Sequence, residues 1–331
     1  MNKYLKTTEK HALTSYCSVR TGETKLGQCI STVNGSDFDA ALNNAKAQYV
    51  LLGIPEDIGI RANFGQPGSA GFWDAFLKSF LNIQSNDFLN GEKIILAGVV
   101  DCDDLMIKAD HLHGEDLSLL VNEIDVRVET VLQTIFKNNK TPIIIGGGHN
   151  NALPIISAAN KAFNKKLNIV NIDPHADMRS TERRHSGNGF SFAMEQNLIE
   201  FYFQVGLHEN YNNNHILRSY NDNEGKMHYF SFDDYLRSKW NFGDLKEFLG
   251  DAMINSLVGL ELDCDSIENM PSSANTPSGF TANEARVLTG MIGTLLEPCY
   301  FHLPEAINAS SPINSAKLVS YLVSDFIKAR G

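Results

Sequence analysis

The sequence predicts an α/β fold with a parallel β-sheet, and two patterns lead to this prediction. Short apolar runs recur along the chain without alternation of apolar and polar residues, as expected for strands that are buried on both faces of a sheet. Amphipathic helical patterns occupy several of the gaps between these runs. Strands that alternate with helices favour βαβ units. About eight strands fit either an open sheet or a barrel, and the pattern alone does not choose between them.

Each strand is expected at one of the apolar runs. In chain order these runs are AQYVLLGI, KIILAGVV, TPIIIGGG, LNIVNID, FYFQVGL, MHYFSF, SLVGLELD and CYFHLPE. The clearest helical pattern is DLSLLVNEIDVRVETVLQTIF, in which apolar residues form one stripe at helical spacing. We expect this stripe to lie in the core; its members are Leu117, Leu120, Val121, Ile124, Val128, Val131, Leu132 and Ile135.

Composition and charge exclude several classes of partner. The chain carries 28 Lys and Arg residues against 39 Asp and Glu residues, and this acidic balance argues against binding to nucleic acid. No apolar run approaches the ~20 residues that a membrane span requires, and the N-terminal sequence shows no apolar core of a secretory signal. The five cysteines are scattered and form no CxxC pair, which is typical of reduced thiols in a cytoplasmic protein.

Three of the apolar runs end in residues that bind metals. In both open sheets and barrels, ligands bind beyond the carboxyl ends of the parallel strands. Residues two apart in an extended segment point the same way, so a DxHxD or DxD segment can direct its side chains into one cavity. These strand ends offer four carboxylates and two imidazoles: His149 after a glycine run, Asp173, His175 and Asp177 after LNIVNI, and Asp263 and Asp265 after SLVGLEL.

This combination predicts a binuclear metal centre. Four carboxylates buried together without cations would repel one another and lose their hydration. Oxygen and nitrogen ligands without thiolate suit Mn²⁺ best, and Ni²⁺, Co²⁺ or Zn²⁺ also fit. Six ligands exceed the needs of one ion with an open position, whereas two ions ~3.5–4 Å apart can activate water and polarise a substrate together. A single DxH or DxD segment is often structural, so the prediction depends on all three strand ends.

The motifs GGGHN, DPHAD and LDCDS, with GIPEDIGIRANFGQPGSAGFWDAF near the start, resemble the ureohydrolases, the family of arginase, agmatinase and formimidoylglutamase. The similarity extends over residues 49–308. It implies an open, eight-stranded parallel sheet with helices on both faces, in a three-layer αβα arrangement. It further implies one domain over residues 1–331, with an N-terminal extension (1–45), a catalytic core (46–310) and a C-terminal helix (311–331). Homo-oligomers, either trimers or hexamers, are implied as well.

The resemblance also implies roles for the metal-binding residues. One ion would be held by His149, Asp173, Asp177 and Asp263. The other would be held by Asp173, His175, Asp263 and Asp265, so that Asp173 and Asp263 bridge the two. In FHLPEAIN, the position of Glu305 resembles that of a family glutamate that binds the cationic C–N group of the substrate, and a carboxylate is a suitable partner for an amidinium.

Within the family, the sequence is most similar to the formimidoylglutamases. Gly148 stands where arginase and agmatinase have an aspartate, and Arg179 stands where formimidoylglutamases have an arginine that can hold a carboxylate by two hydrogen bonds. Phe190 replaces the histidine that serves arginases as a proton shuttle, and His185 is the nearest alternative shuttle. The segment HSGNGF resembles the part of the family that lines the pocket, which implies substrate contacts for Ser186, Gly187 and Asn188.

The predicted reaction is hydrolysis of N-formimidoyl-L-glutamate to L-glutamate and formamide, a step of histidine metabolism. Asp177 would pass a proton from the attacking water to the leaving amine, while Glu305 holds the amidinium and Arg179 the carboxylate. One alternative is a guanidino hydrolase that acts on arginine, agmatine or another guanidine and releases urea. Others are a non-catalytic homologue that binds metal or a small ligand, and a single-zinc deacylase of the histone-deacetylase type.

Overall fold

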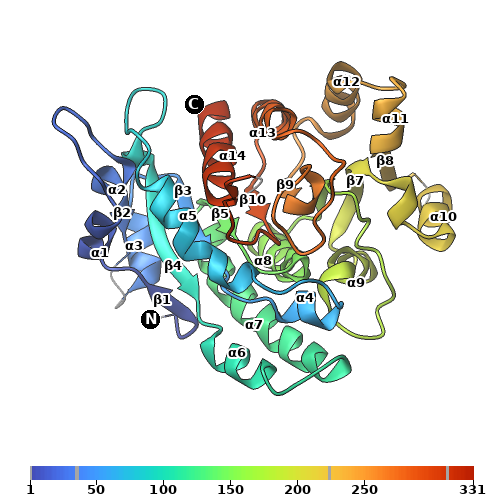
Figure 1. The fold of residues 1–331 in the computed structure, drawn as a ribbon, viewed down its shortest axis with the longest axis horizontal. Helices are drawn as coiled ribbons and strands as arrows, with labels where there is room; N and C mark the ends of the chain where they lie inside the picture. Colours follow the sequence, from blue (N-terminus) through green and yellow to red (C-terminus); the bar gives the residue numbers. More distant parts are fainter. Residues whose placement is uncertain (1, 34–36, 223–224, 311–312) are drawn as a thin grey trace.

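One large sheet organises the computed structural model, which describes residues 2–33, 37–222, 225–310 and 313–331. Its strands follow the order β1-β4-β3-β5-β10-β9-β6-β7-β8, with β2 beside β4 (Figure 1). From β4 to β8 in this order, eight neighbouring strands are parallel. The sheet is open, with β1 and β8 at the two ends of this path. The expectation of an open, roughly eight-stranded parallel sheet is therefore confirmed, and the barrel alternative is wrong.

The eight parallel strands coincide with the eight apolar runs. Their bounds are β3 Tyr49–Gly53, β4 Ile94–Val100, β5 Thr141–Ile145, β6 Leu167–Ile172, β7 Ile199–Leu207, β8 Met227–Ser231, β9 Val258–Leu262 and β10 Tyr300–Leu303. Two short strands were not expected: β1 (Leu5–Thr7) runs antiparallel to β4, and β2 (Ser31–Thr32) runs parallel to it. Both are too short and too polar to give a recognisable pattern.

Helices cover both faces of the sheet and complete the three-layer αβα arrangement. Adjacent residues of a strand face opposite layers, so Tyr49 and Leu51 belong to one core and Val50 and Leu52 to the other. The first core contains α1 (Lys10–Ser15), α2 (Leu26–Cys29), α5 (Phe72–Phe80), α11 (Phe232–Leu236), α12 (Phe242–Met253), α13 (Ala282–Leu296) and α14 (Ser315–Ala329). The second contains α3 (Phe38–Asn44), α4 (Ile58–Ala62), α6 (Asp103–Ala109), α7 (Glu115–Lys137), α8 (Ala152–Phe163), α9 (Gly189–Glu195) and α10 (Asn214–Asp222).

Short 3₁₀ turns lie between these elements. They are η1 (Ser69–Gly71), η2 (Gly91–Lys93), η3 (His149–Asn151), η4 (Ser186–Asn188), η5 (Glu209–Tyr211) and η6 (Cys264–Ser266). Two of them contain predicted metal ligands that follow strands: η3 begins at His149, after β5 and the glycine run, and η6 contains Asp265, after β9. The predicted stripe of apolar residues on α7 is buried along its whole length, as expected.

The predicted terminal segments contribute to the same layers. Within residues 1–45, β1 and β2 join the sheet beside β4, and the last helix, α14, packs in the same core as α5 and α13. Met1, residues 34–36 and residues 311–312, which fall in these two segments, lie outside the described residues. In the described part of the chain, no helix is both long and apolar enough to cross a membrane.

The packing of α7 makes a prediction about stability. Leu132 is fully buried beneath the sheet, whereas Leu119 on the same helix is 69% exposed. Leu132→Ala removes buried methyl groups and leaves a cavity, so we expect it to lower the free energy of unfolding by about 2–5 kcal/mol. Leu119→Ala should change it by less than about 0.5 kcal/mol. Urea unfolding followed by circular dichroism measures both, and equal effects of the two variants would contradict this packing.

Candidate metal centre

The predicted metal-binding residues follow strands that are adjacent at the centre of the sheet. The sheet order β5-β10-β9-β6 brings together four strands that are far apart in sequence. Because all four are parallel, their carboxyl ends meet at one edge of the sheet. His149 follows β5, Glu305 follows β10, Asp263 follows β9 and Asp173 follows β6. The topology therefore gathers these side chains in one place.

One group of acids surrounds the ring of His149. Its Nδ1 lies 3.1 Å from Asp173 Oδ2, 3.0 Å from Asp177 Oδ2 and 3.0 Å from Asp263 Oδ2. The four ligand atoms all lie within 4.8 Å of one another. His149 and Asp173 are completely buried, and Asp263 is nearly so. These four residues are the set predicted to hold one ion.

A second group of acids adjoins the first and shares Asp263 with it. Oxygens of Asp263, Asp265 and Glu305 lie within 4.8 Å of one another. His175, the imidazole predicted for this second ion, lies at the edge of the group, with Nδ1 3.5 Å from Asp173 Oδ1 and 3.8 Å from Asp265 Oδ2. The structure thus brings all six predicted ligands into one cluster, and Glu305 lies beside Asp263 and Asp265.

Local hydrogen bonds orient the two aspartates that were predicted to bridge the ions. Asp173 Oδ1 accepts a hydrogen bond from the backbone N–H of His175 at 2.7 Å, and Asp263 Oδ1 accepts one from that of Asp265 at 2.7 Å. In each case the second oxygen, Oδ2, is the one that faces His149. Such turns are typical of aspartate, because its short side chain reaches the backbone two residues further on. Each carboxylate is therefore held with one oxygen directed into the cluster.

The backbone at this edge adopts conformations that strands do not allow. Gly146 and Gly147 have φ values of +85° and +76°, so the glycine run makes a turn that residues with side chains would strain. Asp177 has a φ of +48° and Glu305 a φ of +67°. The expectation of an extended segment through Asp177 is therefore wrong, because the chain turns there. Non-glycine residues in this region cost energy and are concentrated at functional sites.

Burial raises the pKa of several acids of the cluster; it would also raise that of Asp173, but His149 and His175 lower the pKa of Asp173 to about 2. Burial raises the pKa of Asp263 well above its usual value, and the charges of Asp265 and Glu305 add to this effect. Burial, followed by the charges of Asp265 and Asp177, raises the pKa of Glu305 to about 8. Burial alone would lower the pKa of His149, but the three surrounding aspartates raise it well above its usual value.

These features fit a site for divalent cations. Nδ1 of His149 is buried and makes no regular hydrogen bond, although three carboxylate oxygens lie around it. A cation at this position would accept the lone pair of the imidazole and offset the repulsion between the carboxylates. Oxygen and imidazole donors without thiolate suit Mn²⁺ and related divalent ions.

Glu56 is a buried residue whose role the sequence did not reveal. One oxygen of its carboxylate accepts hydrogen bonds from the Gly148 N–H at 2.9 Å and from the side-chain amides of Asn150 and Asn151. The other accepts from the Ile58 N–H at 2.7 Å. Glu56 therefore fastens the glycine loop to the start of α4 and holds His149 in place. Its position in the motif GIPED gave no sign of these contacts, which depend on how the two loops fold.

Two more buried polar residues lie behind His149 and were also missed. Glu261 is on β9 and His302 is on β10, and both are completely buried. Glu261 Oε2 lies 2.6 Å from His302 Nδ1 and 3.5 Å from His149 Nε2. A signal was present in the sequence, since each is a charged or polar residue inside an otherwise apolar run. Neither lies at a strand end, where ligands of parallel sheets are expected, so the pattern of strands did not single them out.

A pocket of about 290 Å³ opens onto the cluster. Asp177, Asp263, Asp265 and Glu305 lie in its wall, together with Arg179 and Ser186 of the predicted substrate-binding residues. In the described part of the chain, the Arg179 guanidinium makes no hydrogen bond or ion pair. Arg179 therefore presents a free cation to the pocket.

The remaining predicted residues of this segment do not line the pocket. His185 uses its Nδ1 to accept a hydrogen bond from the Gly187 N–H, and burial, together with nearby arginines, lowers its pKa to about 4. The side-chain amide of Asn188 donates to the carbonyls of Ser180 and Arg183, so it is occupied within the fold. A Cβ at Gly187 would come within 3.2 Å of Arg179 Cδ, so this glycine leaves room for the arginine. The HSGNG segment is thus held together by its own hydrogen bonds, and it leaves room for the Arg179 side chain beside Gly187.

Comparisons with known proteins agree with this geometry. The chain is 31% identical to a formimidoylglutamase of Salmonella arizonae over 161 residues, which are 48% of this chain and 46% of that protein. It thus spans a little under half the length of the curated relatives that it matches. The structure resembles formimidoylglutamase from Bacillus subtilis with a TM-score of 0.75 at 15% identity, covering 94% of this chain and 93% of that one. It resembles Trypanosoma cruzi formiminoglutamase with Mn²⁺ with a TM-score of 0.71 at 20% identity, covering 93% and 98%.

A family model gives the assignment. The model of the arginase family matches residues 47–306, which include β3, β10 and every strand end of the candidate metal centre. The strand order and the clustered acids described above are consistent with that match. The chain therefore belongs to the arginase family.

Proposed function

We propose that this protein hydrolyses N-formimidoyl-L-glutamate to L-glutamate and formamide. The observation that carries the proposal is a free arginine, Arg179, in the same pocket as the acid cluster, because the substrate joins a carboxylate-bearing end to an amidine. Relatives that carry the name formimidoylglutamase support it. The substrate would come from histidine breakdown.

The proposed centre holds two divalent ions, of which Mn²⁺ fits the donors best. His149, Asp173, Asp177 and Asp263 would hold one ion, and Asp173, His175, Asp263 and Asp265 the other. When bound, such a pair of ions lowers the pKa of water and polarises the C=N group of a substrate. A Trypanosoma cruzi formiminoglutamase of the same fold has been solved with Mn²⁺.

The remaining steps belong to residues of the chain. Water adds its oxygen to the formimidoyl carbon, and the bond from that carbon to the glutamate nitrogen breaks. Asp177, at the mouth of the cluster, accepts the proton of the attacking water and returns it to the leaving amine. Glu305, which is fixed by the His149 N–H at 3.0 Å and by Ser273, pairs with the amidinium. Arg179 holds the carboxylate of the substrate at the other end of the pocket.

We further propose a cytoplasmic homo-oligomer, either a trimer or a hexamer. Support for the compartment comes from the cysteines, all of which are free in the structure. Support for the oligomer comes from the resemblance to the ureohydrolases.

The reaction can be tested by identifying the products. Mn²⁺-loaded protein is incubated separately with formimidoylglutamate, arginine and agmatine, and glutamate, formamide, urea and ammonia are measured. We expect equal amounts of glutamate and formamide from formimidoylglutamate and little urea from the other two, because only the first substrate combines an amidine with the carboxylate that Arg179 would hold. Urea from arginine or agmatine would instead support a guanidino hydrolase. No product from any compound would favour a non-catalytic homologue.

Arg179 provides a test of substrate recognition. Arg179→Ala removes a charge-assisted contact to the substrate carboxylate, so we expect kcat/KM for formimidoylglutamate to fall by an amount equivalent to about 2–4 kcal/mol. The Mn²⁺ content should not change, because arginine is not a ligand. Steady-state kinetics and elemental analysis measure both quantities.

Arg183→Ala is the matched control. Arg183 lies four residues away and pairs at the surface with Glu115, with Nη1 3.2 Å from Oε1. Its loss should leave kcat/KM close to the wild-type value, since exposed ion pairs contribute little. Two results would show that Arg179 shapes the pocket and does not bind the carboxylate. They are an equal loss of activity in both variants, and an effect of Arg179→Ala on substrates without a carboxylate that is as strong as its effect on formimidoylglutamate.

A further inference from the structure

A charged pair lies inside the sheet, directly behind the metal centre. β9 and β10 are neighbours, and their register places His302 opposite Glu261. Glu261 Oε2 accepts a hydrogen bond from His302 Nδ1 at 2.6 Å, and Oε1 accepts one from the Tyr300 hydroxyl at 2.7 Å. Gly259 makes this arrangement possible, because a Cβ there would lie 2.5 Å from the Tyr300 ring. Burying a carboxylate within a sheet carries a large free-energy cost unless the carboxylate is paired and hydrogen-bonded.

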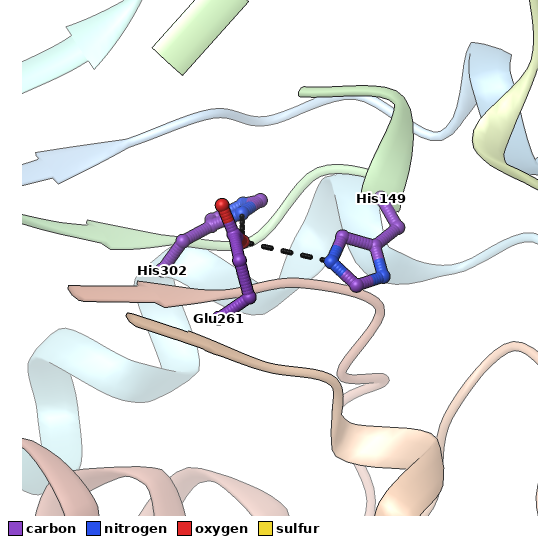
Figure 2. A group of neighbouring side chains, drawn as sticks. All are labelled: His149, Glu261 and His302. Carbon is purple, nitrogen blue, oxygen red and sulfur yellow. Dashed lines mark hydrogen bonds and ion pairs between the residues drawn. The ribbon is translucent and has the colours of Figure 1, made fainter. Parts of the chain in front are cut away.

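His149 connects this pair to the acid cluster. Figure 2 shows the Glu261 carboxylate between the imidazole rings of His302 and His149. Nδ1 of His149 faces three aspartates, while Nε2 faces Glu261 Oε2 at 3.5 Å. That distance is at the outer limit of a hydrogen bond. Nε2 is buried and makes no hydrogen bond of regular geometry within the described residues, so Glu261 Oε2 is the acceptor available to it.

His149, Glu261 and His302 do not form a third metal site. An ion that bound both Glu261 and His302 at about 2.0–2.2 Å would keep the two ligand atoms about 3 Å or more apart. Glu261 Oε2 and His302 Nδ1 are only 2.6 Å apart and are joined by one direct hydrogen bond. The pair is therefore a hydrogen-bonded unit that leaves no room for an ion between its members.

We propose that Glu261 is a positioning residue for the metal centre, an inference that rests on the proposed binuclear site. Held by His302 and Tyr300, its carboxylate accepts the Nε2–H of His149 and so fixes the tautomer whose Nδ1 lone pair faces the ion. A metal-binding histidine needs its hydrogen on the other nitrogen, and a carboxylate partner there makes the imidazole a stronger ligand. None of the three strand-end motifs includes Glu261, since this residue lies within β9.

The test is the affinity of the apo-protein for Mn²⁺, measured by titration with electron paramagnetic resonance of the free ion. Glu261→Leu removes the acceptor, so we expect the affinity of the site that contains His149 to fall about 10- to 100-fold, the usual effect of losing such a partner. Glu261→Gln keeps the shape and a carbonyl acceptor, so its loss should be smaller. This order of affinities, wild type, then Gln, then Leu, is the expected result.

Tyr49→Phe is the control for packing. The Tyr49 hydroxyl is buried on β3 of the same sheet and has no hydrogen-bond partner within the described residues, so the Mn²⁺ affinity of this variant should stay near that of the wild type. Circular dichroism confirms that each variant is folded, and should Glu261→Leu unfold, the isosteric Glu261→Gln carries the comparison.

Three results would overturn the role of Glu261. They are wild-type affinity in Glu261→Gln and Glu261→Leu, an equal loss in Tyr49→Phe, and three ions bound per wild-type chain. A wild-type protein that binds no Mn²⁺ would instead contradict the binuclear centre, and this role with it. The two failures are distinguishable, because in the first the wild-type protein still binds Mn²⁺.

Discussion

Repulsion between buried carboxylates at the carboxyl edge of β5, β10, β9 and β6 is the constraint on which this structure depends. Asp173, Asp263, Asp265 and Glu305 share one enclosed space, and burial raises the pKa of Asp263 and Glu305. Positive charge within such a cluster offsets the repulsion. Divalent cations supply such charge directly. The glycine turn, the Glu56 contacts and the strained backbone at Asp177 all serve to hold this cluster.

Strands and a loop both contribute to the proposed site. Asp173 and Asp263, which face His149, directly follow β6 and β9, and these strands are fixed by the cores on both faces. Asp177, Arg179 and Ser186 come from the loop between β6 and α9, and all three line the pocket. The strands therefore fix the two proposed bridging ligands, whereas the loop supplies one further proposed ligand and the residues proposed to contact the substrate.

Sequence patterns predicted the parts of the structure that depend on local periodicity. The eight parallel strands and the buried stripe of α7 follow from apolar runs, and the acids at strand ends follow from the rule that parallel strands end together. Contacts between distant segments were not predictable in this way. Glu56 accepts hydrogen bonds from a loop about ninety residues further on, and Asn188 is occupied by the carbonyls of Ser180 and Arg183. Glu261 was not predicted because it lies inside a strand, and the apolar pattern that predicts a strand gives no role to a single charged residue within it.

The binuclear centre is the central claim, and a crystal grown with Mn²⁺ tests it most directly. Anomalous difference density measured at the manganese edge locates the ions without reference to any assumed ligand. We expect two peaks about 3.5–4 Å apart, with Asp173 and Asp263 contacting both, His149 and Asp177 contacting one, and His175 and Asp265 contacting the other. A single peak, or a peak bound by Glu261 and His302, would contradict the account.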